Sequence, residues 1–390
     1  MKRKILTLIV ILIMLKVAKV FADEKKYDLG KIIVTATKTL SYQAEVGSST
    51  TVVSEDDIER AGKRTIYEVL KEIAGVSIVQ NSAFGGLTSV YLRGAKPGHT
   101  LIMIDGVEAN DPMSTDRSFD FAHLTTDNIE RIEIVRGPQS TLYGSDAMAG
   151  VINIITKKGK GKPTWNSCLE GGSYNTFRRS LGLSGSIDKF SYSISTLRLD
   201  SDGISKAVGG TEKDGYDKTV ISSKVDYQLF DNSQLSLVSR FTDAKTSLDD
   251  GAYDDDPNYT ARWRDFSSKF TFEQSINSWW SHNLSFSYHD IRRKYLDEKD
   301  NIEPLDFSSS WYKGNNKKFE WQHNFHPVDW DTITFGFEYE EEIGSSYYYS
   351  ESLWGPYESK FDRKKVNNKG WYLQNQLMLW DSLFITPGFR

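Results

Sequence analysis

Two acidic stretches of the 390-residue chain contain the residue types best suited to bind a metal ion. The first runs from Glu212 to Gly215, and the second holds six aspartates between Asp243 and Asp256. Carboxylates that converge from two loops suit a hard cation such as calcium, which takes about six to eight oxygen ligands. Acidic runs are also common in solvated loops without a metal, so both interpretations stay open.

Catalytic chemistry is not indicated by any familiar motif. The sequence contains no Gly-x-Ser-x-Gly, no Walker phosphate loop and no His-Glu-x-x-His. His323 and His326 are three positions apart in an expected strand, where they face opposite sides and cannot chelate one ion without a bulge. Cys168 is the single cysteine, which excludes an internal disulfide and a cysteine-based zinc site. Because these catalytic motifs are absent, we do not expect an enzyme. The net charge of -5 offers no basic field for nucleic acid, so we do not expect a nucleic-acid-binding protein either.

The N-terminus has the features of an export signal. Three basic residues at positions 2 to 4 precede the apolar run from Ile5 to Leu15, and Val20 and Ala22 place small side chains at the cleavage positions. We expect cleavage after Ala22, which makes residues 1–22 a signal peptide. The apolar run is shorter than the roughly 20 residues that span a bilayer, and no later segment approaches that length. A membrane role would therefore depend on strands.

Residues 48–158 are predicted to form a compact α+β domain. Ser54 with Asp57, and Thr65 with Glu68, have the spacing of helix capping boxes. The apolar residues after Thr65 recur at helical period. Strand-like runs of mostly apolar residues follow at 76–79, 89–92, 101–104, 132–135 and 151–155.

Residues 159–390 are predicted to form part of an antiparallel transmembrane β-barrel. Segments such as 190–195 and 333–340 alternate between ring-bearing or aliphatic side chains and small or polar ones. We count about eleven such strands, each near the length that a tilted membrane strand needs. Short connections alternate with long polar ones, which is typical of outer-membrane barrels with short periplasmic turns. The last long loop is expected over residues 341–368. A soluble β-sandwich with its apolar face inward is the alternative.

Several motifs between residues 31 and 158 resemble TonB-dependent outer-membrane receptors, including those for cobalamin and siderophores. The family's plug domain is matched by segments 90–94, 101–107, 132–138 and 142–156. Within the N-terminal segment 23–47, the stretch 31–36 is similar to the energy-coupling TonB box. That stretch reads Lys31, Ile32, Ile33, Val34, Thr35 and Ala36.

The resemblance implies a plug inside a barrel of about 22 strands. About eleven strands are half of that number, so we expect the chain to be an incomplete receptor that alone neither inserts stably nor transports.

The function implied by the resemblance is energy-coupled uptake across the cell outer membrane. External loops would capture a scarce, bulky solute, namely cobalamin or a ferric siderophore. TonB, driven by its inner-membrane energising complex, would then pull on the box. The β-branched Ile32, Ile33 and Val34 suit strand addition to a partner sheet, although they could instead form a plain first strand of the plug. No cofactor is required beyond a possible calcium ion, and the other expected contact is outer-membrane lipid.

Three sets of site residues accompany this interpretation. Arg93 and Arg136 would be buried in the barrel and pair with Glu338 and Glu340, with a surface position as the alternative. Four acidic residues occupy positions similar to the calcium-binding loops of the cobalamin receptors, namely Glu212, Asp214, Asp243 and Asp250. The candidates for ligand contact are the loop residues Tyr347, Tyr348, Tyr349 and Trp354.

Two functions of other classes stay open on the sequence. A passive porin or adhesin barrel would conduct ions without TonB, but it leaves the plug and the box unexplained. A soluble periplasmic binding protein or enzyme on a β-rich fold would remain in solution when membranes are pelleted.

Overall fold

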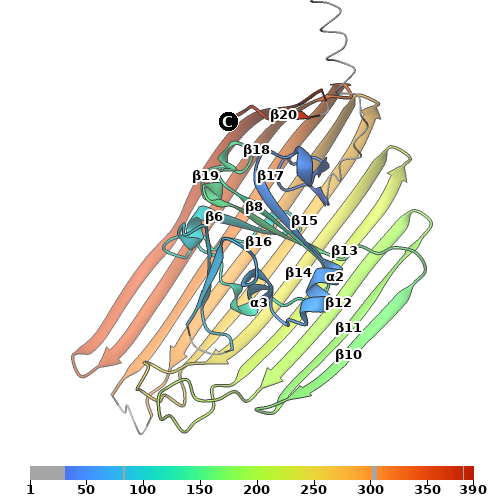
Figure 1. Cartoon of the computed structure of the whole chain (residues 1–390). Coiled ribbons are helices and arrows are strands. Elements are labelled where there is room, and N and C mark those ends of the chain that lie inside the picture. The colour runs from blue at the N-terminus through green and yellow to red at the C-terminus, as the bar shows by residue number, and fades with distance from the viewer. Residues whose placement is uncertain (1–30, 82–83, 301–304, 381) are drawn as a thin grey trace, which may run out of the picture.

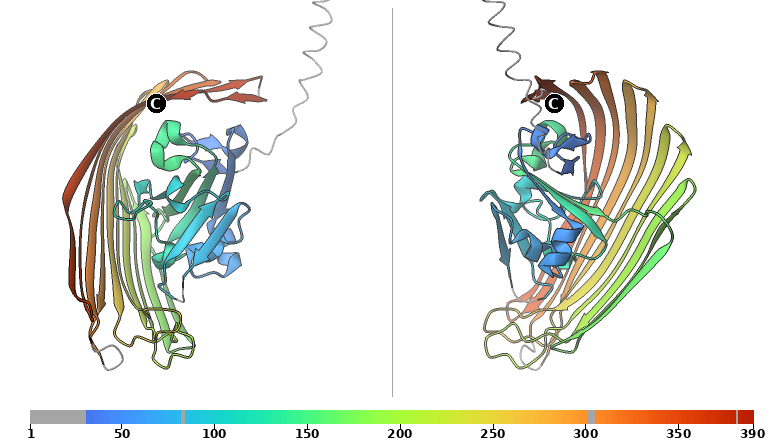
Figure 2. Two further views of the ribbon diagram at one scale, coloured as in Figure 1. Left: turned by 90° about the vertical axis from the view of Figure 1, so that its left-hand side faces the viewer. Right: turned by 45° about the vertical axis from the view of Figure 1, so that its right-hand side comes forward.

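The computed structural model describes residues 31–81, 84–300, 305–380 and 382–390. They form an N-terminal domain (residues 31–156) and a large antiparallel sheet that curves around one side of it (Figures 1 and 2). Among these residues, no helix has both the length and the apolar character needed to cross a membrane. The expected signal peptide lies outside the described residues.

A five-stranded sheet forms the centre of the N-terminal domain. The strand order is β3-β8-β9-β6-β7, and only the β6–β9 pair is parallel. Ile132 and Ile134 of β8 and Ile152 and Ile154 of β9 are fully buried, which places the hydrophobic core on this sheet. The strands are β3 (Ser49–Ser54), β6 (Thr100–Ile104), β7 (Val107–Glu108), β8 (Ile129–Arg136) and β9 (Gly150–Thr156).

Two helices begin at the capping boxes predicted from the sequence. The Ser54 side chain accepts a hydrogen bond from the Asp57 amide while the Asp57 carboxylate accepts one from the Ser54 amide, and Thr65 and Glu68 do the same. The second helix packs its buried apolar residues on the core. The helices are α2 (Glu55–Ala61), α3 (Ile66–Leu70) and α4 (Ser140–Tyr143), with 3-10 turns η1 (Gln43–Glu45), η2 (Pro97–His99), η3 (Phe121–His123) and η4 (Ser145–Ala147). Two small hairpins complete the domain, β1 (Ile32–Ile33) with β2 (Ser41–Tyr42) and β4 (Val76–Gln80) with β5 (Thr88–Leu92).

The large sheet has twelve strands, close to the number predicted. Strands β10 to β20 pair in sequence order, and β21 pairs with β19; within the described residues the outer strands do not meet to close a barrel. The strands are β10 (Thr164–Gly172), β11 (Thr176–Ile187), β12 (Phe190–Ser201), β13 (Tyr216–Phe230), β14 (Ser233–Ser247), β15 (Thr260–Asn277), β16 (Trp280–Asp297), β17 (Phe307–Val328), β18 (Asp331–Ser352), β19 (Gly355–Leu379), β20 (Leu383–Ile385) and β21 (Gly388–Phe389).

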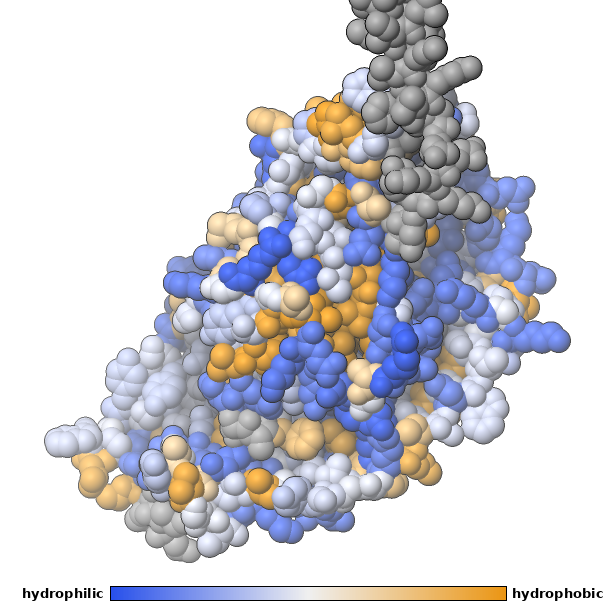
Figure 3. All heavy atoms as spheres, viewed as in Figure 1, coloured by the Kyte–Doolittle hydropathy of each residue, from blue (hydrophilic) through white to orange (hydrophobic). Residues whose placement is uncertain are grey.

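The two faces of the large sheet differ in polarity. In β16 Ser285 is buried and Phe286 exposed, and in β18 Thr334 is buried and Phe335 exposed. The polar face is concave and covered by the N-terminal domain, as the side view shows (Figure 2). Much of the surface on the N-terminal-domain side is hydrophilic (Figure 3). The alternation predicted from the sequence is therefore present, with the ring-bearing side outward.

The connections between strands differ at the two ends of the sheet. At one end, two-residue turns such as 188–189 and 231–232 join the strands, whereas at the other end β12–β13 and β14–β15 are joined by 202–215 and 248–259. The expectation of a long loop over residues 341–368 is wrong, because β18 and β19 continue pairing as far as Ser352 and Gly355.

Candidate ligand-binding and coupling site

Ion pairs join the N-terminal domain to the concave face of the sheet. Each joins a residue of the domain to a residue of a strand, and most of the side chains are largely buried. A buried charge that loses its partner strongly destabilises the protein, so these pairs fix the position of the N-terminal domain against the sheet. They include Lys38–Glu320 (2.5 Å), Glu108–Lys318 (2.5 Å), Arg117–Glu342 (2.7 Å), Asp105–Lys224 (3.0 Å), Asp111–Arg293 (3.0 Å) and Asp127–Arg178.

The ion pairs expected for Arg93 and Arg136 are not formed. Arg93 is exposed, and Arg136 donates to the Ala74 carbonyl (3.0 Å) and the Thr51 hydroxyl (2.9 Å). Both side chains pack over the turn at Gly75, inside the N-terminal domain, which keeps them away from the strands that carry the two glutamates. Those glutamates have other partners, Lys318 and Arg390 for Glu338 and Asn316 for Glu340.

Residues 31–36 are folded into the N-terminal domain. Ile32 and Ile33 pair with β2, and Ile33 is fully buried. The amides of Val34 and Thr35 donate to the Glu133 carboxylate at 3.0 and 2.8 Å, and the Thr35 hydroxyl donates to the same oxygen at 2.6 Å. This arrangement corresponds to the alternative in which the stretch is a first strand of the domain, while its coupling role stays a prediction.

A cavity of about 450 Å³ lies between the N-terminal domain and the long-loop end of the sheet. Its volume is in the range of sites for small molecules. The lining combines aromatic rings with charges of both signs, contributed by the domain, the strands and the loops 202–215 and 248–259. These side chains include Asp111, Asp120, His123, Lys206, Asp249, Arg262, Trp263, Arg293 and Tyr295.

Two titratable groups of the N-terminal domain, the half-buried Asp120 and the buried His123, line this cavity. Asp120 accepts hydrogen bonds from the Thr88 and Ala122 amides, and burial raises its pKa to about 6. Burial lowers the pKa of His123 to about 3, so its ring is neutral at pH 7 and shares a hydrogen bond with the Tyr216 hydroxyl (3.0 Å). This side of the cavity therefore presents a neutral imidazole beside the Trp263 ring, whose centroid is 5.2 Å away.

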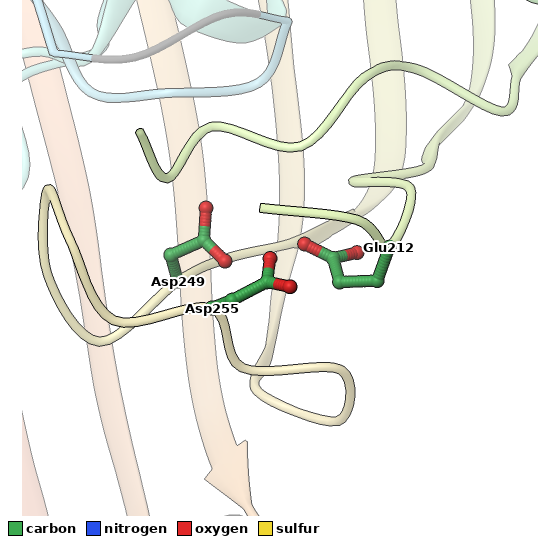
Figure 4. Close-up of side chains that lie close together, drawn as sticks. All are labelled: Glu212, Asp249 and Asp255. Carbon is green, nitrogen blue, oxygen red and sulfur yellow. The ribbon is translucent and has the colours of Figure 1, made fainter. Parts of the chain in front are cut away.

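Three carboxylates from the two long loops converge beside this cavity (Figure 4). One oxygen each of Glu212, Asp249 and Asp255 lies within 4.8 Å of the others. Burial and the neighbouring carboxylates raise the pKa of Glu212 to about 8. Burial also raises the pKa of Asp214 to about 6, and one buried oxygen of this residue has no hydrogen-bond partner. A proton or a cation must offset this repulsion, and an oxygen-only donor set fits calcium.

The acidic residues expected from the sequence divide into two groups. Glu212 belongs to the cluster, and Asp214 is its close neighbour. Asp243 does not, because it lies in β14 opposite Arg264 and forms ion pairs with Arg262 (2.6 Å) and Arg264 (3.3 Å). Asp250 is exposed and outside the cluster. Asp249 and Asp255 complete the cluster in place of Asp243 and Asp250. Both belong to the run of aspartates between positions 243 and 256 that indicated a metal site in the sequence.

The expected aromatic contacts lie in the β18–β19 hairpin. Tyr347 and Tyr349 point to one face of β18 and Tyr348 to the other, since strand side chains alternate. Trp354 occupies the turn and is 96% exposed. None of the four lines the cavity; Trp263 and Tyr295, which do, carry no distinguishing signal in their strands.

Comparison with known proteins identifies the N-terminal domain. Residues 43–151 match the family model of the TonB-dependent receptor plug domain. These residues are a TonB-dependent receptor plug. The match confirms the resemblance predicted from the motifs, and a plug on a many-stranded antiparallel sheet confirms the fold class.

Curated relatives of the chain include two transporters. The chain is 32% identical over 232 residues to the vitamin B12 transporter BtuB of Photobacterium profundum, which covers 59% of this chain and 38% of the relative. It is 35% identical over 187 residues to BtuB of Vibrio vulnificus, or 48% of this chain and 28% of that protein. The matched part of the chain thus spans less than two fifths of either relative's length.

Solved structures share the fold. The ferripyoverdine receptor of the Pseudomonas aeruginosa outer membrane superposes with a TM-score of 0.73 at 14% identity, covering 92% of this chain and 53% of the receptor. BauA, the ferric preacinetobactin receptor of Acinetobacter baumannii, gives 0.73 at 14% identity, covering 92% and 59%. At this identity the plug and sheet share architecture with these receptors, and nothing finer follows.

Proposed function

We propose that the chain belongs to an outer-membrane receptor that takes up a scarce, bulky solute with energy supplied through TonB. The observation that carries this proposal is the position of two sites at opposite ends of one docked plug. The cavity faces the long loops, whereas Thr39 to Ser41, just after the coupling segment, lie beside His326 and Trp330 near a short turn. Capture at one end and a pulling point at the other are the geometry that energised uptake needs.

The relatives and the cavity both support a solute class. The curated relatives are vitamin B12 transporters, and the structural neighbours are receptors for ferric siderophores. The cavity offers Trp263 and Tyr295 for packing and Arg262 and Arg293 for anionic groups. We assign cobalamin or a ferric siderophore as the solute. Tyr348, which lies on the same face of β18 as Glu342, and Trp354 in the adjoining turn are proposed as further contacts, whereas Tyr347 and Tyr349 lie on the outward face with Phe335.

A calcium ion completes the proposed capture site. Glu212, Asp249 and Asp255 would hold it, with the unpartnered oxygen of Asp214 as the neighbouring acceptor. Bound calcium supplies the positive charge that these carboxylates lack. Because the ligands come from two loops, the ion would fix the loops 202–215 and 248–259 to each other beside the cavity.

Titration of the purified chain in detergent with cobalamin and with ferric siderophores, with and without calcium, tests the capture site. We expect saturable quenching of tryptophan fluorescence by one solute class. Trp263→Ala should weaken binding at least about tenfold, which is the loss expected for a buried ring contact. Trp330→Ala, at the opposite end of the sheet, is the matched control. Binding of neither class would remove the assigned solute, and ion conductance without TonB would favour a passive porin.

A further inference from the structure

The backbone groups of Val34 and Thr35 in the docked coupling segment are already bonded within the chain. The Val34 and Thr35 amides donate to Glu133, the Val34 carbonyl accepts from the Thr37 and Lys38 amides, and the Thr35 carbonyl accepts from the Tyr143 hydroxyl at 2.9 Å. Strand addition uses these same amides and carbonyls. Val34 and Thr35 must therefore leave their docked position before another chain can pair with them.

One carboxylate makes most of these contacts on the plug side. Glu133 is fully buried in the middle of β8, where one oxygen accepts the three bonds from Val34 and Thr35. Its other oxygen accepts from Arg131 Nε at 2.8 Å. Hydrogen bonds to an ionised acceptor are about twice as strong as those to a neutral one. The Glu133 carboxylate therefore provides the strongest hydrogen bonds that hold Val34 and Thr35 in place.

A separate set of contacts holds the residues that follow. Lys38 pairs with Glu320, while strand glutamines donate to the Thr37 carbonyl (3.3 Å), the Lys38 carbonyl (3.0 Å) and the Thr39 hydroxyl (2.9 Å). These bonds join residues 37–39 to the large sheet and involve no atom of Glu133. Release at Glu133 can therefore free the Val34 and Thr35 amides while the plug stays docked.

A polar cavity of about 340 Å³ adjoins the segment between the plug and the large sheet. Val34, Thr35 and Arg131 line it together with lysines and carboxylates of both parts. Water in such a cavity can replace the hydrogen bonds that the segment gives up. The docked and the released states can thus both satisfy their polar groups.

We propose that Glu133 is a positioning residue that holds Val34 and Thr35 in a state closed to strand addition, and that release of this one carboxylate opens the coupling segment. The inference rests on the proposed function, since the strand to be added is that of TonB. Its structural half, the closed state held by Glu133, can be measured without TonB.

Thiol labelling of Ala36→Cys in the full chain with Cys168→Ser tests the closed state. Ala36 is buried when docked, so its reaction with a maleimide reports release. Thr35→Val keeps the side-chain shape and removes the hydroxyl, which donates to Glu133 at 2.6 Å and accepts from Asn153 at 3.2 Å. Loss of the bond to the charged group should raise the labelling rate roughly tenfold or more, and Glu133→Gln separates this bond from the one to Asn153. Thr37→Val is the matched control, because Thr37 is also buried and close to position 36 but its hydroxyl bonds to Thr39 and Ser41 and not to Glu133.

Equal labelling of the parent and the Thr35→Val chain would overturn the proposal, and so would an equal rise for Thr37→Val. Should Thr35→Val fail to fold, Glu133→Gln gives the same test, with Glu130→Gln on the same strand as its control. The amide introduced at position 133 lacks the negative charge and would place an N–H donor against the Arg131 guanidinium. Binding of the purified TonB C-terminal domain is then measured on the same variants. Faster labelling without TonB binding would retain the Glu133 contact and refute the proposed function, whereas unchanged labelling refutes the Glu133 contact whatever TonB does.

Discussion

Lys38 shows how much one side chain contributes to docking of the plug. Burial lowers its pKa, the nearby Glu320 carboxylate opposes that shift, and its ammonium lies over the rings of Tyr143 and Tyr372 at 4.8 and 4.4 Å. Lys38→Met leaves Glu320 buried without its cation, which should cost about 3–5 kcal/mol of unfolding free energy. Urea unfolding measures this, with the exposed Lys96→Met as control; a loss below about 1 kcal/mol would contradict a docking role.

His123 gives the plug a defined response to acid. Its pKa is about 3 when folded, against about 6.5 in an unfolded chain. The unfolded state therefore binds more protons as pH falls below 6.5, and stability is lost in that direction, by about 2 kcal/mol at pH 5 from this group alone. His123→Phe should remove that part of the pH dependence in urea unfolding at pH 7.5 and pH 5. Asp120, with its raised pKa, acts in the opposite sense in both chains, so the difference between the chains isolates His123.

At the residue scale, the sequence predicted which residue types form the sites better than it predicted their hydrogen-bond and ion-pair partners. The stretch 31–36 and the acidic loops were found because their composition is local. Glu133 and Thr35 are 98 positions apart, and Lys38 and Glu320 are 282 apart, so no spacing rule connects them. The ion pairs predicted between the plug arginines and the strand glutamates were wrong for the same reason. Arg136 instead donates a hydrogen bond to the carbonyl of Ala74, in a nearby turn of the plug.

At the scale of elements, the two long loops are expected to act as one calcium-dependent unit. Asp249→Asn should lower calcium affinity at least about tenfold, because it removes a charged ligand. Asp250→Asn, its exposed neighbour outside the cluster, should leave the affinity unchanged. Isothermal titration of the two variants makes the comparison, and equal affinities would contradict the assigned ligands.

The same cluster predicts a pH dependence of metal binding. With the pKa of Glu212 near 8 and that of Asp214 near 6 in the metal-free protein, protons compete with calcium throughout this range. Affinity should therefore fall as pH drops from 8.5 to 6, and proton release should accompany binding. Calcium affinity that is constant over these pH values would refute the cluster as the binding site.

Elements were predicted well where one face is buried. The capping boxes of α2 and α3 and the alternation of β12, β16 and β18 follow from local sequence and a two-sided environment. The outer part of β19 was missed because residues 356–369 are exposed on both faces and need not alternate. Backbone pairing with β18 alone defines that part of the strand.

At the scale of the whole molecule, the polarity of the sheet predicts which side contacts lipid. Phe286 and Ser285 are neighbours in β16 but point to opposite faces, outward and toward the plug. In lipid discs, with Cys168→Ser removing the native thiol, a bilayer-soluble thiol reagent should label Phe286→Cys and leave Ser285→Cys unmodified. Phe190 and Phe335, on the same outward face, should behave like Phe286. Preferential labelling of position 285 would place the apolar face away from lipid.

The arrangement of plug against sheet could be predicted only by resemblance. Composition separates a ring-poor N-terminal part from a ring-rich remainder, but the ion pairs that join them link residues such as Arg117 and Glu342, which are 225 positions apart. What the local pattern did establish is that the sheet has a polar side, and the plug covers that side.

Cross-linking of the coupling segment to TonB in cells is the most direct test of energised uptake. Ile32→Cys and Leu40→Cys, each with Cys168→Ser, place thiols inside and just outside the segment, and Leu40 is the more exposed of the two, at 79% against 50%. We predict a disulfide between position 32 and a cysteine in the TonB C-terminal domain, and none from position 40. Equal cross-linking at both positions, or cross-linking at position 40 alone, would contradict a coupling role for residues 31–36.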